Sequence, residues 1–186
     1  EELVEMQKTL GITFLFVTHD QEEAMSMATH MCIMEKGIIK QTGTPADLYE
    51  RPKSSFVAKF LGEINCLVGT VEQQIGNLVT ISLGENGKIQ LLSEANKIKN
   101  NRCYVRPEKI FFDTGKEQKE PVNSLEGTLV GIDFFGSYTR YQIQLTDGTF
   151  FKLSLHHRKS KQQKHFIGDS VRVLFPISDV FQIHEN

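Results

Sequence analysis

The chain has 186 residues, 39% of them hydrophobic and 24% charged, with a formal net charge of −2 and a pI near 6.3. This length suits one large or two small globular domains with enough mass to bury a core. The balanced charge gives no general attraction to nucleic acid or to anionic membranes. No apolar run reaches the roughly 18 residues of a membrane-spanning helix, so contact with a membrane would go through a partner.

The three cysteines, Cys32, Cys66 and Cys103, lie far apart in the sequence. They show no Cys-x-x-Cys spacing, so the sequence predicts neither a zinc site nor a disulfide framework. We expect them to pack as small apolar groups in a reducing cytosol, and we predict no metal site in this chain.

The first 28 residues predict a helix, a strand and a second helix. Apolar residues recur at helical spacing from Glu1 to Leu10, and Gly11 is placed to end that helix. The run from Ile12 to Val17 is mostly β-branched or aromatic, which predicts a strand buried on both faces, as in a parallel sheet. The second helix is predicted over residues 22–28.

His19 follows the predicted strand directly and is the candidate site residue of this region. Asp20 is a plausible N-cap for the next helix, with Glu23 three residues later. Open α/β sheets bind their ligands at the carboxyl ends of the strands, where this histidine is expected to lie. On residue type alone, a single histidine at a strand end is more often a packed or hydrogen-bonded group than part of a site.

Residues 31–62 predict a β-hairpin and two short helices. Strands over 31–34 and 38–42 flank a turn in which Gly37 supplies a positive φ. Thr44-Pro45 opens one helix, and Ser54 or Ser55 caps the other. We expect the Phe-rich face of the last helix to be core.

After residue 63 the hydrophobic period changes from helical to alternating, and we predict no further helix. Many short strands separated by turn signals indicate a sandwich or a barrel. The predicted strands cover residues 66–73, 78–82, 88–92, 103–106, 110–113, 124–135, 137–145, 149–155, 170–176 and 180–184.

The segment Thr18-His-Asp-Gln-Glu-Glu-Ala24 resembles the switch-histidine segment of the ATPase subunits of ABC importers. The resemblance continues through Ile33–Tyr49 and Arg51–Asn65, and within the family it is greatest to the polyamine (spermidine/putrescine) importers. Val105-Arg-Pro-Glu108 and Gly127–Ser137 are similar to two recurring phrases of the family's C-terminal TOBE domain, so the resemblance covers the whole chain.

The resemblance implies an α/β remnant of a P-loop ATPase domain over residues 1–62, followed by an all-β regulatory region of two OB-like TOBE barrels over 63–186. It also implies partners: a second copy of the subunit, joined through the β domain, and transmembrane permease subunits. No nucleic acid is expected, and the location implied is peripheral, at the cytoplasmic face of the membrane.

ATP hydrolysis in this family needs a Gly-x-x-x-x-Gly-Lys-Ser/Thr loop, a Leu-Ser-Gly-Gly signature and an Asp-Glu pair after a strand, because these bind phosphate and magnesium. The sequence contains none of them. In the family all three precede the switch histidine, so we expect the chain to be the C-terminal piece of a longer protein that uses ATP and Mg²⁺. Only His19 is carried over as catalytic, by contact with the γ-phosphate. Alone, the chain is expected to be inactive and to bind no cofactor.

Several alternatives stay open. The cargo could be a sugar, sulfate, phosphonate or iron, since Gly62-Glu-Ile-Asn65 favours polyamines only weakly. A stand-alone β-barrel module that binds a small ligand or nucleic acid is a rival from another class. Arg106-Pro107-Glu108 is predicted to be a structural corner in preference to a ligand site. The basic run from His156 to His165 is predicted to be a solvated loop, because no aromatic residue interrupts it to stack on a base.

Overall fold

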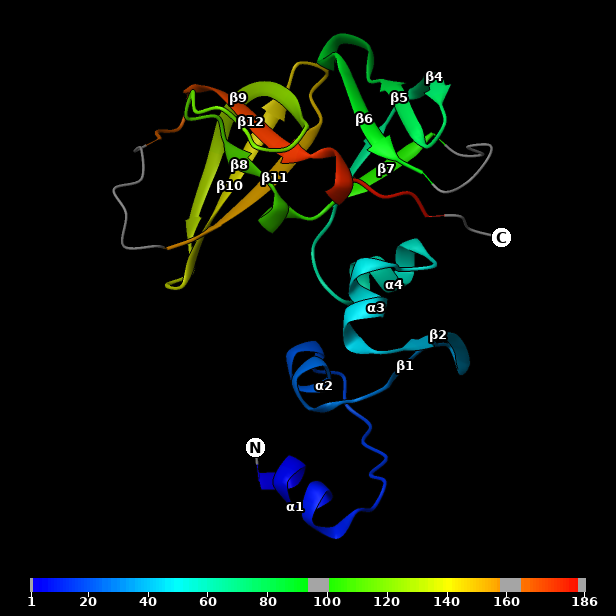
Figure 1. Ribbon diagram of the computed structural model, residues 1–186. Coiled ribbons are helices and arrows are strands. Elements are labelled where there is room, and N and C mark those ends of the chain that lie inside the picture. The colour runs from blue at the N-terminus through cyan, green and yellow to red at the C-terminus, as the bar shows by residue number, and fades with distance from the viewer. Residues whose placement is uncertain (1, 94–100, 158–164, 184–186) are drawn as a thin grey trace. The chain divides into compact units, whose positions relative to one another are not determined.

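The computed structural model describes residues 2–93, 101–157 and 165–183 (Figure 1). The chain divides between Gly62 and Glu63 into two compact units. The first unit is mainly helical with one hairpin, and the second is built almost entirely of strands. Among the described residues no helix is long and apolar enough to cross a membrane.

The first unit agrees with most of the elements expected from its sequence. Asp20, Thr44 and Ser54 cap three helices, each accepting a hydrogen bond from the backbone N–H three residues later. Lys36 and Gly37 form the hairpin turn with φ values of 51° and 79°, as a two-residue turn with two positive φ angles requires. The elements are α1 (Glu2–Leu10), α2 (Gln21–Met27), β1 (Met31–Glu35), β2 (Ile38–Gly43), α3 (Pro45–Glu50) and α4 (Ser55–Phe60).

A small core holds the hairpin and the last two helices together. Ile33 from β1, Leu48 from α3, and Val57 and Leu61 around α4 are buried against one another. The buried Gln41 side chain ties the connection between the helices: its Nε2 donates to the Arg51 carbonyl (3.0 Å) and its Oε1 accepts from the Lys53 amide (2.8 Å). These bonds satisfy the polar atoms that the core would otherwise leave unpaired.

The prediction of a buried parallel strand over Ile12–Val17 is wrong for this chain. The segment forms neither helix nor strand, and Leu15 and Val17 are 94% and 89% exposed. A central strand of a parallel sheet needs a hydrogen-bonded neighbour on each side, and in the described residues only the β1–β2 pair is formed in this unit. The apolar composition of the run therefore has no sheet in which to be buried.

The described residues of the second unit form ten strands and three 3₁₀ turns, of which η2 (Pro107–Lys109) and η3 (Ile177–Asp179) occupy matching places in the repeat described below. The third turn, η1, spans Gly84–Asn86. The strands are β3 (Asn65–Val68), β4 (Thr70–Ile75), β5 (Leu78–Ser82), β6 (Lys88–Leu92), β7 (Arg102–Val105), β8 (Phe111–Phe112), β9 (Val122–Phe134), β10 (Tyr138–Leu145), β11 (Phe150–His156) and β12 (Ser170–Pro176).

The strands form a five-stranded sheet in the order β11-β10-β9-β12-β8, a three-stranded sheet β4-β5-β6 and the pair β3-β7, all antiparallel. The single strand predicted over 66–73 is two strands in the structure, because Gly69 interrupts it between β3 and β4. The predicted strand over 180–184 is reduced, within the described residues, to one bridge between Phe181 and Tyr104. Part of the predicted basic loop, residues 158–164, lies outside the described residues.

The second unit repeats one structural motif twice, a feature that the sequence analysis did not detect. We call residues 63–120 the first half and residues 121–183 the second half. A bulge interrupts the β4–β5 pairing after Val71 and the β9–β10 pairing at the matching place after Leu129. Identical residues occupy matching positions in the two halves: Asn65 and Asn123, Leu67 and Leu125, Gly69 and Gly127, Thr70 and Thr128, Ile81 and Ile143, Leu83 and Leu145, and Leu91 and Leu153.

The two halves exchange their last strands. Phe111 of the first half pairs with Leu174 on β12, and Phe181 of the second half pairs with Tyr104 on β7. The Phe181 amide donates to the Tyr104 carbonyl (3.0 Å), and the Tyr104 amide donates back (2.8 Å). The exchange places the last extended segment of each half, β8 in the first and the bridge residue Phe181 in the second, beside a strand of the other half.

A single hydrophobic core runs through both halves. It joins residues of the first half, such as Val79 and Ile89, to residues of the second half, such as Phe151 and Val173, and all four are fully buried. The OB-like β region expected from the sequence is thus present, and its halves share one interior. Burial of this continuous core, at about 25 cal/mol per Å² of apolar surface, is the main term that stabilises the unit.

Candidate functional site

His19 lies at an exposed bend directly before the N-cap of α2. Its neighbours are ordered locally: the Thr18 hydroxyl donates to Glu23 Oε2 (2.8 Å), the Asp20 amide donates to Thr18 Oγ1 (3.0 Å), and the Glu23 amide donates to Asp20 Oδ1 (3.0 Å). The polar turn expected around His19 is therefore formed, although the strand before it is not.

The described residues bring no metal-binding set to His19. Among them no group of three or more His, Cys, Asp or Glu side chains is arranged to hold a metal ion. A single exposed imidazole cannot bind and neutralise a triphosphate, since phosphoryl transfer depends on several positioned donors and magnesium ligands. His19 remains a predicted site residue whose function would need groups that the described residues do not supply.

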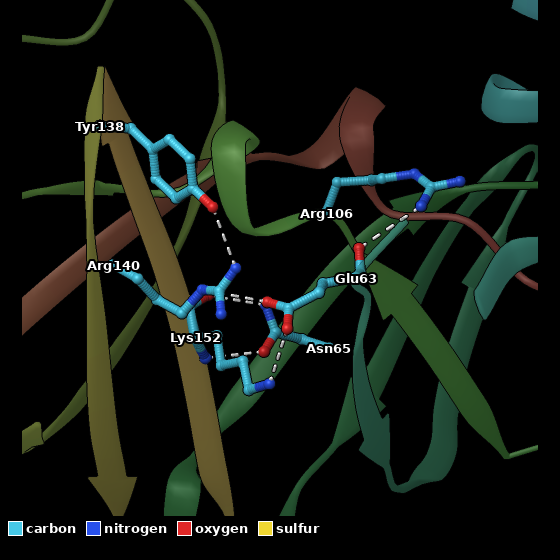
Figure 2. Close-up of polar contacts among 6 residues, drawn as sticks. All are labelled: Glu63, Asn65, Arg106, Tyr138, Arg140 and Lys152. Carbon is cyan, nitrogen blue, oxygen red and sulfur yellow. Dashed lines mark hydrogen bonds and ion pairs between the residues drawn. The ribbon is translucent and has the colours of Figure 1, made fainter. Parts of the chain in front are cut away.

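A second polar cluster, which the sequence analysis missed, surrounds Glu63 (Figure 2). Glu63 is the first residue of the second unit, which we call the β unit from here on. Glu63 Oε2 lies 3.2 Å from Arg140 Nε, and Glu63 Oε1 lies 3.1 Å from Lys152 Nζ. Each carboxylate oxygen thus faces its own cation, one on β10 and one on β11. The side chains of Glu63 and Lys152 are 39% and 40% exposed, whereas that of Arg140 is only 24% exposed.

The main chain at Glu63 is held by a third cation. Arg106 is buried, and its Nη1 donates to the Glu63 carbonyl oxygen (3.4 Å). In the second half, the matching carbonyl of Pro121 accepts from the backbone amide of Ile177 (3.2 Å). The matching residue of the first half, Pro107, has no amide hydrogen, so the Arg106 side chain takes over that donor role.

Asn65 stands beside this cluster and joins the two halves of the unit. Its Nδ2 donates to the Lys152 carbonyl (2.8 Å), and its Oδ1 accepts from the Lys152 amide (2.7 Å). Asn123 makes the same two bonds to the backbone of Gln90, at 2.8 and 2.6 Å. Each asparagine is buried, so these bonds also satisfy its own amide group.

Aromatic side chains gather at the end of the β9–β10 hairpin. The rings of Phe135 and Tyr138 stack at 4.9 Å, and the Arg140 guanidinium carbon lies 4.7 Å from the Phe135 ring centre. Arg140 Nη2 also donates to the Tyr138 hydroxyl (3.3 Å). Phe134 is 73% exposed and lies 5.3 Å from the His157 ring. Arg140 therefore contacts both the aromatic end of the hairpin and the carboxylate of Glu63.

Two further groups in the β unit have shifted acidities with clear physical causes. Burial raises the pKa of the Cys103 thiol to about 12. A hydrogen bond from the Asn86 side chain, followed by one from the Thr149 amide, lowers the pKa of Asp147 at the β10–β11 turn. A thiol with this pKa is neutral at pH 7, so Cys103 acts as a packed apolar group, as expected. The same expectation is wrong for Cys32, which is exposed, while Cys66 is half-buried.

Two signals in the sequence could have revealed the cluster around Glu63. The repeated Asn-x-Leu-x-Gly-Thr pattern at Asn65 and Asn123 marks the two halves. The Arg106-Pro107 pair is the corner that the sequence analysis expected, and it opens the 3₁₀ turn η2. Arg140 and Lys152 carry no local signal, because only the tertiary fold brings them to Glu63.

Comparison with known proteins gives a consistent picture. Residues 103–182 match the TOBE domain family. The chain is 35% identical over 175 residues to the spermidine/putrescine import ATP-binding protein PotA of Ruegeria pomeroyi, a match that covers 94% of this chain and 46% of that protein. It is 38% identical over 154 residues to the PotA protein of Thermobifida fusca, covering 80% of this chain and 38% of that protein. For PotA 2 of Pseudomonas aeruginosa the identity is 33% over 173 residues, covering 91% and 48%.

The chain thus spans less than half the length of these curated relatives. A solved structure of the cytoplasmic molybdate-binding protein ModG is similar with a TM-score of 0.50 and 17% sequence identity, and covers 64% of this chain and 93% of that one. At this level of identity the likeness concerns the fold alone.

Proposed function

This chain is related over most of its length to the ATP-binding proteins of spermidine/putrescine importers and carries a TOBE domain, and we propose that it is the C-terminal part of such a subunit. In this proposal the longer protein hydrolyses ATP with Mg²⁺ to energise polyamine uptake. The observation that carries the proposal is the 35% identity maintained over 94% of the chain, against 46% of the relative.

Residues 1–62 are, in this proposal, the end of a P-loop ATPase domain, and residues 63–186 are its regulatory β domain. The exposed apolar run Ile12–Val17 supports the assignment, since exposed Leu15 and Val17 would be buried on pairing with strands of a larger parallel sheet. His19 would then lie at the carboxyl edge of that sheet, where it donates a hydrogen bond to the γ-phosphate.

The proposed partners follow from the same assignment. Two subunits pair through their β domains, transmembrane permease subunits bind the ATPase domains, and the assembly lies at the cytoplasmic face of the membrane. A cargo other than polyamine, such as a sugar, sulfate, phosphonate or iron, remains the alternative within the same class of importer.

The role of His19 is tested in the longer protein with the substitution His19→Ala. We expect ATP binding to change less than about threefold, while turnover falls by about 10² to 10⁴, the range for loss of a transition-state contact. His30→Ala is the matched control, because His30 is an exposed histidine of the same unit and should keep full turnover. Preserved turnover in His19→Ala would refute the assigned role.

The fragment interpretation is tested on the 186-residue chain itself. We expect no Mg²⁺-ATP turnover, and no heat of ATP binding by calorimetry, because the phosphate-binding loop and the acidic pair are missing from its sequence. Measurable turnover would mean that these residues form a nucleotide site of their own. The proposal that ATP hydrolysis needs residues outside this chain would then be wrong.

A further inference from the structure

The charged cluster at Glu63 breaks the symmetry of the β unit. The matching residues are Pro121 for Glu63, Leu78 for Arg140, Gln90 for Lys152 and Pro176 for Arg106. The equivalent site at the other end of the repeat is thus held by the same asparagine contacts, those of Asn123, without any of these four charges. The charges of Glu63, Arg140 and Lys152 are therefore not needed to join the halves and call for another explanation, whereas Arg106 replaces the backbone donor that Pro107 lacks.

The position of Glu63 indicates what that function is. Glu63 is the first residue of the β unit, and it follows Gly62, the last residue of the preceding unit. Its carboxylate lies between Arg140 and Lys152, while its carbonyl accepts from Arg106. Two contacts therefore hold the chain where it enters the β unit. Residues on strands β10 and β11 bind the Glu63 side chain, and Arg106, directly before η2, binds its main chain.

Arg140 connects this hold to an exposed surface. The first-half hairpin turns at Gly76-Asn77, directly after the pair Ile75–Leu78. The second-half hairpin continues past the matching pair Asp133–Arg140 and carries Phe134 and Phe135 beyond it. Arg140 lies against the Phe135 ring and donates to Tyr138, so its guanidinium is positioned by the hairpin extension and by Glu63 together.

We propose that Glu63, Arg140 and Lys152 form a charged lock that restrains the chain where it enters the β unit, at the Gly62–Glu63 junction, and that Arg140 couples the lock to the aromatic end of the β9–β10 hairpin. A change in the positions of Phe135 and Tyr138 moves Arg140 away from Glu63 and loosens the junction. This inference rests on the β unit alone and does not depend on the proposed transport function.

The geometry suits a releasable contact better than a permanent one. Arg140 Nε is 3.2 Å from the carboxylate but is not aligned for a hydrogen bond, so the contact is an ion pair without that directional bond. Exposed ion pairs are individually weak, and salt screens them. The lock combines the exposed Lys152–Glu63 hydrogen bond (3.1 Å) with a partly buried Arg140–Glu63 pair that lacks a hydrogen bond at Nε, so it opens at modest energetic cost, whereas the buried Asn65 bonds keep β3 in place when it opens.

The lock is tested by hydrogen exchange of the backbone amides at residues 62–65 in the full chain. Glu63→Gln keeps the size of the side chain and removes its charge, and we expect it to speed exchange there by about threefold to tenfold, the effect of weakening these two ion pairs. Exchange at Ile143 and Phe151 in the core should not change, which checks that the fold is intact.

Glu72→Gln is the matched control. Glu72 pairs with Lys88 at 2.6 Å in the same unit, and its side chain is 36% exposed, close to the value for Glu63. We expect no change at residues 62–65 in this variant. In the unchanged chain, 1 M NaCl should reproduce the effect of Glu63→Gln, and it should add nothing in the variant. Equal exchange in Glu63→Gln and the unchanged chain, or equal acceleration in Glu72→Gln, would refute the lock.

The coupling to the hairpin is tested with Phe135→Leu, which removes the ring beneath Arg140 and keeps an apolar side chain. We expect faster exchange at residues 62–65 in this variant, and no further increase when it is combined with Glu63→Gln, because the two changes break the same connection. If Phe135→Leu leaves the junction unchanged, or if the two effects add fully, Arg140 does not couple the hairpin to the junction.

Discussion

The two halves of the β unit show which parts of a repeated fold are structural and which are additions. Asn65 and Asn123 make the same pair of backbone contacts across the unit, and Gly69 and Gly127 sit at the same close approach of two strands. By contrast, Glu63, Arg106, Arg140 and Lys152 have no charged counterparts. What both halves keep is required by packing, and charges found at only one of the two equivalent sites between the halves call for a separate explanation.

The shared core gives the largest expected effect. Phe151 of the second half is fully buried, and its counterpart Ile89 is equally buried. Phe151→Ala should lower the free energy of unfolding by about 3 to 5 kcal/mol, because it leaves a cavity in a core that serves both halves. Chemical denaturation measures the change, and a single cooperative transition should persist. Phe16→Ala, in the exposed run of the first unit, is the control and should change stability by less than about 0.5 kcal/mol.

The paired glycines give the next largest effect. A Cβ at Gly69 would collide with the Ser82 carbonyl oxygen, and one at Gly127 would lie 2.5 Å from the Gln144 carbonyl oxygen. Gly69→Ala and Gly127→Ala should each cost about 3 kcal/mol, since the obstacle is backbone that cannot move aside. Gly131→Ala is the control on the same strand, because its Cβ would meet only the Gln142 side chain at 3.3 Å. A loss in the free energy of unfolding below about 1 kcal/mol at either paired glycine would show that the two halves are not equivalent at this position.

The paired asparagines, Asn65 and Asn123, give the third largest expected effect. Asn65→Ala and Asn123→Ala should each lower the free energy of unfolding by about 2 to 3 kcal/mol, because each leaves the part-buried backbone N–H and C=O of Lys152 or Gln90 without their partner. Similar costs in urea denaturation would support one structural role for both. Gln144→Ala, at an exposed position on β10, is expected to be near neutral. A large difference between the two asparagines would show that the charged cluster compensates for Asn65.

The smallest effect is a difference in pH dependence between the halves. Cys103 of the first half matches Val173 of the second, and burial raises the thiol pKa from 9.0 to about 12. Between these values the unfolded chain loses the thiol proton while the folded chain keeps it, so stability falls as pH rises above 9. Cys103→Val should reduce that fall by up to about 1.4 kcal/mol per pH unit. An unchanged slope, measured by denaturation at pH 8 to 11, would contradict the buried thiol as its source.

Local signals in the sequence predicted the elements well where those elements depend on nearby residues. The caps at Asp20, Thr44 and Ser54 are formed as expected, because capping is a contact between residues three apart. The strands over 78–82, 88–92 and 170–176 have the predicted bounds. Alternation of apolar and polar residues marks a strand with one buried face wherever it lies in the fold.

The failure at Ile12–Val17 has the opposite cause. Its composition is that of a buried strand, but burial requires neighbouring strands that the described residues do not provide, and so the run is exposed. His19 illustrates the same limit. Its turn was predictable, whereas the function assigned to it depends on groups outside the described residues and stays a prediction.

The sequence by itself determined the division near Gly62, where the hydrophobic period changes, together with the caps, the turns and most of the strands. These features depend on backbone propensities and on contacts between residues that are close in the chain. The repeated Asn-x-Leu-x-Gly-Thr pattern marks two halves in the sequence, but only the tertiary structure decided that the halves exchange their last extended segments and that Glu63 faces Arg140 and Lys152. These contacts join residues more than 60 positions apart. No local pattern specifies such a pairing, because it follows from burying one continuous core.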